Sequence, residues 1–160
     1  MRISVCCRIR IRATAPSGSK ARSRRLSTIP FGAVHRKLGG SLKYLVSGGA
    51  ALDPEVGRDL AALGFEVLEG FGMTEAAPMI TFPRPGQVKM GSCGQALPGL
   101  SVKIVEGEVV ASGPNIMKGY YHKPEETAEA LRDGWLYTGD LGYLDEDGYL
   151  FITGRKKEIL

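Results

Sequence analysis

The sequence predicts a mixed α/β fold, in which a parallel strand–helix–strand unit is followed by a β-rich, distorted-barrel part. Residues 42–68 hold two apolar runs separated by an amphipathic segment, as in a parallel unit. After Phe82, short apolar runs alternate with Gly-containing turns, as in antiparallel sheets. With 160 residues, 43% of them hydrophobic, the chain is long enough for one core-bearing domain.

The parallel unit is predicted from its boundary residues. Leu42–Val46 is typical of a buried strand, and Asp53 is a natural N-cap with Pro54 in the first helical position. Gly64 is placed to end the helix, and Phe65–Leu68 forms a second strand. The helix repeats its apolar residues on one face, at Val56, Leu60 and Leu63. Such a unit delivers two Gly-containing loops to one edge of a sheet.

The β-rich part is predicted from turn residues between apolar runs. Strands are expected at Val102–Val105, Glu108–Ala111, Trp135–Tyr137, Tyr143–Leu144 and Tyr149–Ile152. The dipeptide Asp147–Gly148 separates the last two runs and is a strong hairpin signal. A helix is expected to interrupt the strands at Pro124–Leu131.

Charge is distributed unevenly along the chain. The net charge is +4, but no acidic residue precedes Asp53, and 11 of the 21 Lys and Arg residues do. From Asp53 onward the net charge is −7, so we expect no nucleic-acid partner. Residues 1–30, Arg- and Ser-rich, are predicted to be a disordered basic leader. They fit either an organelle transit peptide or an unrelated translated segment.

Cysteine content and hydropathy bear on the compartment. Cys6, Cys7 and Cys93 are odd in number and lack metal-ligand spacing, so a reducing, cytoplasmic location is expected. No apolar run reaches the roughly 18 to 20 residues of a spanning helix, so no integral membrane segment is expected. Cys93 is interpreted as a small residue in a strand or turn, in preference to a catalytic thiol.

Three motifs carry groups suited to a phosphorylated nucleotide. Gly70–Glu75 follows a predicted strand and offers glycines, an aromatic ring, a hydroxyl and a carboxylate that suits Mg²⁺. Tyr137–Asp140 also ends a predicted strand, where a carboxylate can accept hydrogen bonds from ribose hydroxyls. Gly154–Glu158 is a basic cluster after the last hairpin. Taken singly, the first two fit ordinary turns and the third fits a solvated charged edge.

Five motifs in one order resemble those of the adenylate-forming (AMP-binding) enzymes, among them the acyl-CoA synthetases and especially the long-chain fatty-acid CoA ligases. The resemblance covers Phe31 to Leu160. The motifs are Gly48–Ala50, Gly70–Glu75, the group Gly107-Glu108, Gly113–Asn115 and Gly119-Tyr120, then Tyr137–Asp140, and Gly154–Ile159.

The resemblance implies a role for each matching residue. In this family a carboxylic acid attacks the α-phosphate of ATP, and coenzyme A captures the acyl-adenylate. Thr74 would contact phosphate and Glu75 would hold Mg²⁺, which makes these two the expected catalytic residues. The other implied roles are adenine binding by Gly49, Ala50 and a stacking Phe71, ribose binding by Asp140 and Arg155, and a hinge at Lys157.

The resemblance also implies a domain organisation. We expect residues 31–154 to be part of the large AMP-binding domain and residues 155–160 to be the hinge before an absent C-terminal domain. The family's Ser/Thr/Gly-rich phosphate loop has no counterpart here, because Ser17–Lys20 lacks its threonines. The expected function is therefore part of an ATP-, Mg²⁺- and coenzyme A-dependent acid–thiol ligase for a carboxylic acid, most simply a fatty acid. The alternative is an inert or nucleotide-binding fragment.

Overall fold

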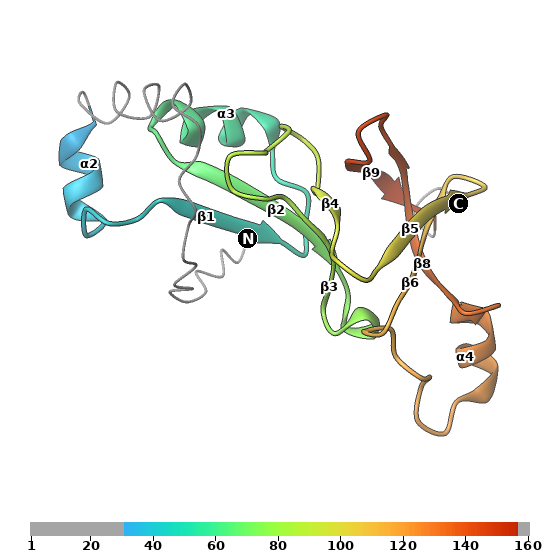
Figure 1. Ribbon diagram of the computed structural model, residues 1–160. Helices are drawn as coiled ribbons and strands as arrows, with labels where there is room; N and C mark the ends of the chain where they lie inside the picture. Colours follow the sequence, from blue (N-terminus) through green and yellow to red (C-terminus); the bar gives the residue numbers. More distant parts are fainter. Residues whose placement is uncertain (1–30, 157–160) are drawn as a thin grey trace.

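The computed structural model describes residues 31–156 and shows a mixed α/β chain built on two sheets, which confirms the predicted fold class (Figure 1). The first sheet has the order β1 (Tyr44–Gly48), β2 (Glu66–Gly72), β3 (Met79–Phe82) and β4 (Gln95–Ala96). The second has the order β5 (Ser101–Val105), β6 (Glu108–Ser112), β8 (Trp135–Leu144) and β7 (Leu131–Arg132), with β9 (Leu150–Arg155) paired to β8. The predicted leader lies outside the described residues.

The predicted parallel unit is present. Strands β1 and β2 pair in parallel, from Tyr44 opposite Glu66 to Gly48 opposite Gly70. Helix α3 (Pro54–Ala62) connects them, and the Asp53 side chain accepts a hydrogen bond from the Glu55 N–H, as expected of an N-cap. Strand β2 continues past the predicted end to Gly72. Helix α2 (Gly32–Lys37) was not predicted, because six residues without an N-cap hydrogen bond carry little signal.

The apolar face of α3 is only partly covered. Gly57 is the only buried residue of this helix, and Val56 is 40% exposed. Strand β1 of the same unit is also poorly covered, because its Val46 is 56% exposed. The sequence pattern therefore located the helix correctly, while the depth of its burial depends on what lies against it.

The antiparallel hairpins of the second part also agree with the prediction. Strands β5 and β6 pair from Ser101–Ser112 to Val105–Glu108, across the turn at residues 106–107. Strands β8 and β9 pair around the turn that contains Asp147–Gly148, with Leu144 opposite Leu150. The interrupting helix α4 (Pro124–Ala130) precedes β7. Strand β8 is ten residues long and joins the predicted strands Trp135–Tyr137 and Tyr143–Leu144 into one, which corrects that prediction.

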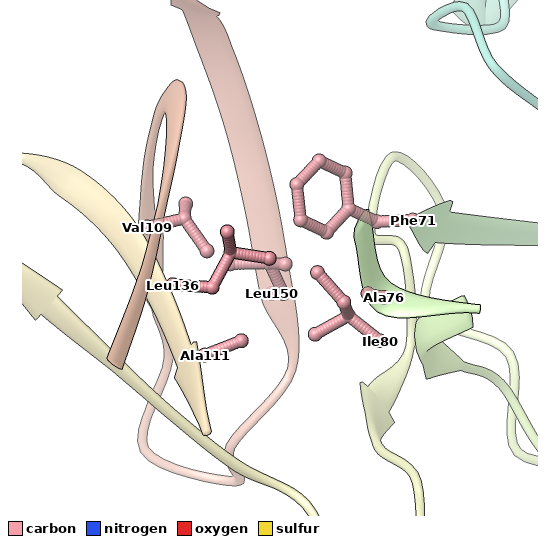
Figure 2. Packing of buried hydrophobic residues seen from close by; sticks show 7 residues of the cluster. All are labelled: Phe71, Ala76, Ile80, Val109, Ala111, Leu136 and Leu150. Carbon is pink, nitrogen blue, oxygen red and sulfur yellow. The ribbon is translucent and has the colours of Figure 1, made fainter. Parts of the chain in front are cut away.

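One hydrophobic core joins the two sheets. Figure 2 shows Phe71, Ala76 and Ile80, from β2, the 3-10 turn η1 (Thr74–Ala76) and β3, facing residues of the second sheet. Those residues are Val109, Ala111, Leu136 and Leu150. Six of the seven are fully buried and Phe71 is 9% exposed. Because the motif Gly70–Glu75 runs along this core, its backbone is fixed by both sheets. Among the described residues no helix is long and apolar enough to cross a bilayer.

Candidate functional site

The motif Tyr137–Asp140 forms a bulge inside β8 and does not end a strand, which corrects the prediction. Glu108 pairs with Leu141 while Val110 pairs with Tyr137, so residues 138–140 all lie opposite Val109. Gly139 has a φ of +74°, a left-handed conformation that glycine adopts without strain. The turn-favouring residues therefore kink the strand, and bulges of this kind often aim a side chain at a site.

Side chains replace the ladder bonds that the bulge interrupts. The Thr138 hydroxyl donates to the Val109 carbonyl at 2.8 Å and accepts from the Asp140 N–H at 3.2 Å. The Gly139 N–H donates to Oε1 of Glu108 at 2.9 Å. The Thr138 hydroxyl and the N–H groups of Gly139 and Asp140 are thereby hydrogen-bonded within the protein, which keeps the shape of the bulge defined.

Two buried carboxylates hold two successive basic residues at the end of β9. Asp140, 6% exposed, lies opposite Arg155 in the β8–β9 ladder, and its Oδ1 accepts from the Arg155 Nε at 2.8 Å. Glu108 is also 6% exposed, and its Oε2 accepts from the Lys156 Nζ at 2.9 Å. The Arg155 and Lys156 side chains are themselves mostly exposed. The predicted partners Asp140 and Arg155 are thus in direct contact.

The motif Gly70–Glu75 runs from the end of β2 into η1. Phe71 is buried in the core, whereas Thr74 is exposed and Glu75 is half-buried. Gly72 has no room for a side chain, since a Cβ there would lie 1.9 Å from the Pro78 carbonyl oxygen. The exposure of Thr74 and Glu75 means that the turn presents the Thr74 hydroxyl and the Glu75 carboxylate toward the surface. The stacking of Phe71 on a purine stays a prediction, and the ring packs in the core here.

The η1 turn is held by the segment that follows β6. The Asn115 side-chain amide donates to the carbonyls of Ala76, at 2.6 Å, and Met79, at 2.8 Å. The Met117 N–H donates to the Glu75 carbonyl at 2.8 Å. Tyr120 donates its hydroxyl proton to Oε1 of Glu75 at 2.7 Å. This contact raises the Tyr120 pKa, because the proton is shared with a carboxylate.

Gly49 and Ala50 lie in the exposed segment directly after β1. Since β1 and β2 are parallel and Gly48 pairs with Gly70, this segment leaves the sheet at the same edge as Phe71. The predicted adenine-binding residues therefore belong to neighbouring strand ends. Lys157, the predicted hinge, lies outside the described residues.

An open pocket of about 470 Å³ adjoins both the bulge and the η1 turn. Met73, Tyr120 and Thr138 line it together with residues of α4. Glu108, Gly139 and Lys156 complete the wall on the bulge side. The pocket therefore brings together residues of four of the five motifs, which are separated by up to 83 positions in the chain.

The donor set fits a hard cation shared with a phosphate. The described residues contain no group of three or more His, Cys, Asp or Glu that would bind a metal alone. Mg²⁺, however, is commonly held by one or two carboxylates together with substrate phosphates. In Glu75 only Oε1 receives a hydrogen bond from a described residue, so Oε2 is available as a ligand.

Cys93 lies in the irregular segment two residues before β4, so the predicted strand or turn is not observed at this residue. The thiol is half-buried, and burial raises its pKa to about 11. A thiol with so high a pKa carries little thiolate at neutral pH and is a poor nucleophile.

Sequence reasoning assigned no role to Glu108, Asn115 and Tyr120, although all three occur in the quoted motifs. Each acts on a residue 31 to 45 positions away: Glu108 on Gly139, Asn115 on Ala76, and Tyr120 on Glu75. For Glu108 a sequence signal was available, because a glutamate directly follows the turn glycine Gly107 and opens an apolar run.

Comparison with known proteins identifies the family. The family model described as AMP-binding enzyme matches residues 8–121. A long-chain-fatty-acid–CoA ligase of Bacillus subtilis is 42% identical over 135 residues, which cover 75% of this chain and 24% of that protein. The chain thus spans about a quarter of the length of this relative.

Solved structures share the fold. The O-succinylbenzoate coenzyme A synthetase of Bacillus subtilis in complex with AMP aligns with a TM-score of 0.68 and 29% identity, over 79% of this chain and 30% of that one. The same synthetase with ATP and magnesium ion aligns at 0.66 and 31%, over 72% and 27%. With the family model matching more than two thirds of the sequence, the chain belongs to the AMP-binding enzyme family.

Proposed function

We propose that this chain is a segment of an acid–thiol ligase that activates a carboxylic acid as its acyl-adenylate and passes it to coenzyme A. The observation that carries the proposal is the bulge carboxylate Asp140, which is buried, paired with Arg155 and next in the chain to Thr138 and Gly139, two residues that line the pocket. Family membership supports this reaction class.

The nucleotide would be held by groups from both sheets. In this proposal Asp140 accepts hydrogen bonds from ribose hydroxyls through Oδ2, because Arg155 engages Oδ1. Gly49 and Ala50 line the base with Phe71. Thr74 contacts a phosphate, and Glu75 is the ligand of Mg²⁺, which offsets charge on the transferring phosphoryl group. AMP, ATP and magnesium occur in the solved relative, which supports these cofactors.

A fatty acid is the proposed acid, because the relative named above is a long-chain-fatty-acid–CoA ligase. The aligned synthetase for O-succinylbenzoate provides the competing acid class. Ala77, Pro78 and Met79 line a second, largely apolar pocket of about 290 Å³ with Leu97 and Leu100, which is suited to an alkyl group. The proposed domain organisation is a partial AMP-binding domain at 31–154 and a hinge at 155–160, with a cytoplasmic location.

Nucleotide binding by the 160-residue chain tests the site. We expect ATP to bind, and Asp140→Ala to weaken binding about tenfold or more, since a charge-assisted hydrogen bond contributes about 1.5 to 3 kcal/mol. The matched control is Asp59→Ala on the exposed side of α3. Isothermal titration calorimetry would measure both. Equal ATP affinities of a folded Asp140→Ala protein and the control would remove Asp140 from the site.

A segment exchange tests the reaction and its acid. Residues 31–156 would replace the matching segment of the Bacillus subtilis long-chain-fatty-acid–CoA ligase. We expect pyrophosphate exchange and acyl-CoA formation with fatty acids and not with 2-succinylbenzoate. A folded chimera that binds ATP without exchanging pyrophosphate would favour the alternative, a nucleotide-binding segment without activity of its own.

A further inference from the structure

The side chain of Glu75 is held by a residue 45 positions away. The Tyr120 hydroxyl donates to Oε1 of Glu75 at 2.7 Å, and the nearby Met117 N–H donates to the Glu75 carbonyl at 2.8 Å. Both the backbone and the carboxylate of Glu75 are therefore fixed by the segment 117–120. An unrestrained glutamate would instead sample several rotamers at a cost in entropy when it binds a ligand.

Tyr120 is in turn fixed by the first turn of α4. Its N–H donates to the Thr127 hydroxyl at 2.9 Å, and that hydroxyl donates to the Lys123 carbonyl at 2.6 Å. The preceding Gly119 lies so close to α4 that a Cβ there would be 2.7 Å from Cγ2 of Thr127. A continuous chain of contacts thus runs from α4 through Tyr120 to Glu75.

We propose that Tyr120 is a positioning residue that orients the Glu75 carboxylate toward a divalent cation. The hydroxyl occupies Oε1 and leaves Oε2 as the oxygen without a donor among the described residues. This inference rests on the proposed function, in which Glu75 is the Mg²⁺ ligand. Hydrogen bonds to ligating carboxylates commonly control metal affinity by about 10- to 100-fold, so the hydroxyl matters beyond the fold.

The neighbouring tyrosine offers a matched control. Tyr121 is 88% exposed and contacts the ring of His122. Tyr120→Phe and Tyr121→Phe each remove one hydroxyl and keep the ring, so only the first deletes the hydrogen bond to Glu75. Glu75→Gln removes the negative charge of the proposed metal ligand and shows how much Mn²⁺ affinity is lost when that ligand is disabled.

The test measures Mn²⁺ binding to the 160-residue chain in the presence of ATP, by electron paramagnetic resonance of free and bound Mn²⁺. We expect Tyr120→Phe to weaken Mn²⁺ binding about tenfold. We expect Tyr121→Phe to match the wild type. The affinity for ATP in EDTA should be the same in wild type, Tyr120→Phe and Tyr121→Phe. A general structural loss would weaken ATP binding together with Mn²⁺ binding.

The outcomes separate this inference from the proposed function. If wild type and Glu75→Gln bind Mn²⁺ alike, Glu75 is not a metal ligand, and both proposals fail at that residue. If Glu75→Gln loses Mn²⁺ but Tyr120→Phe keeps wild-type affinity, only the role of Tyr120 is wrong. Should Tyr120→Phe fold poorly, Thr127→Val against Thr127→Ser tests the same chain of contacts. The valine variant should bind Mn²⁺ less tightly than the serine variant, and equal affinities would overturn the inference.

Discussion

The two ends of the molecule differ in how deeply their strands are buried. Four of the five residues of β6 are buried, whereas none of β1 is, and Val46 there is 56% exposed. The core residues come from β2, η1 and β3 on one side and from β6, β8 and β9 on the other. The parallel unit therefore contributes its inner strand to the core, while β1 and α3 lie at the periphery.

This difference places most of the candidate site at the more deeply buried end of the molecule. The η1 turn and the β8 bulge both adjoin the shared core, and only the segment with Gly49 and Ala50 belongs to the peripheral end. Preorganised groups favour ligand binding because less ordering is needed. The segment with Gly49 and Ala50 should consequently be the least ordered part of the proposed nucleotide site.

The largest contrast is expected between Leu136→Ala and Val46→Ala. Leu136 is fully buried, so its truncation should lower the free energy of unfolding by about 2 to 5 kcal/mol. Val46 is largely exposed, and its truncation should cost about 0.5 kcal/mol or less. Urea denaturation followed by fluorescence of Trp135 would measure both. Similar losses would show that β1 is packed as tightly as the core.

A second contrast concerns two glycines. An alanine at Gly72 would collide with the backbone of Pro78, so we expect a loss of about 3 kcal/mol. Gly49 has open space around it, and alanine there costs only the left-handed conformation at φ +82°, about 1 to 2 kcal/mol. Thermal unfolding by circular dichroism separates the two. A smaller decrease in Tm for Gly72→Ala than for Gly49→Ala would contradict the close approach of Gly72 to the Pro78 backbone.

Glu108 provides a test at the buried end of the molecule. Glu108→Ala should cost about 1 to 3 kcal/mol, because it leaves the Gly139 N–H without its acceptor and Lys156 without its partner. Glu108→Gln keeps an acceptor oxygen for Gly139 and should cost less. Chemical denaturation of the two variants is the measurement, and equal losses would mean that the hydrogen bond to the bulge contributes nothing.

The smallest effect is expected at the exposed pair of Lys89 and Asp145. Lys89 lowers the pKa of Asp145, so the pair stabilises the fold above the unfolded carboxyl pKa of about 3.9. That contribution is lost as the pH falls through the lowered pKa. Lys89→Met should therefore reduce the Tm slightly at pH 7, and the difference should shrink in 1 M NaCl and at low pH. A large, salt-independent loss would contradict the surface character of this pair.

Local signals were predictable from the sequence, and long-range ones were not. The N-cap Asp53 and the turn at Asp147–Gly148 act within a few residues, and both predictions are confirmed. The motif Tyr137–Asp140 was predicted at a strand end because its residues favour turns. Residues that favour turns also form bulges, as they do here. Only the pairing with β6, 29 residues away, distinguishes the two.

The candidate site shows the same limit. Asp140 and Arg155 are in contact, whereas their shared role in ribose binding stays a prediction that rests on the resemblance. The burial of Phe71 was not predicted, because it depends on Leu136 and Leu150 from distant strands. The contact of Tyr120 with Glu75 likewise needs α4 in place, which no local pattern specifies.

One carboxylate links the shape of the bulge to the position of the chain beyond β9. Glu108 bonds the Gly139 N–H through one oxygen and the Lys156 ammonium through the other. If residue 156 moves away, the buried charge keeps only the bulge as its partner. A ligand that tightens the bulge around Asp140 would then also favour the position in which Lys156 contacts Glu108. By thermodynamic reciprocity, contact of Lys156 with Glu108 would raise the affinity for that ligand by the same free energy.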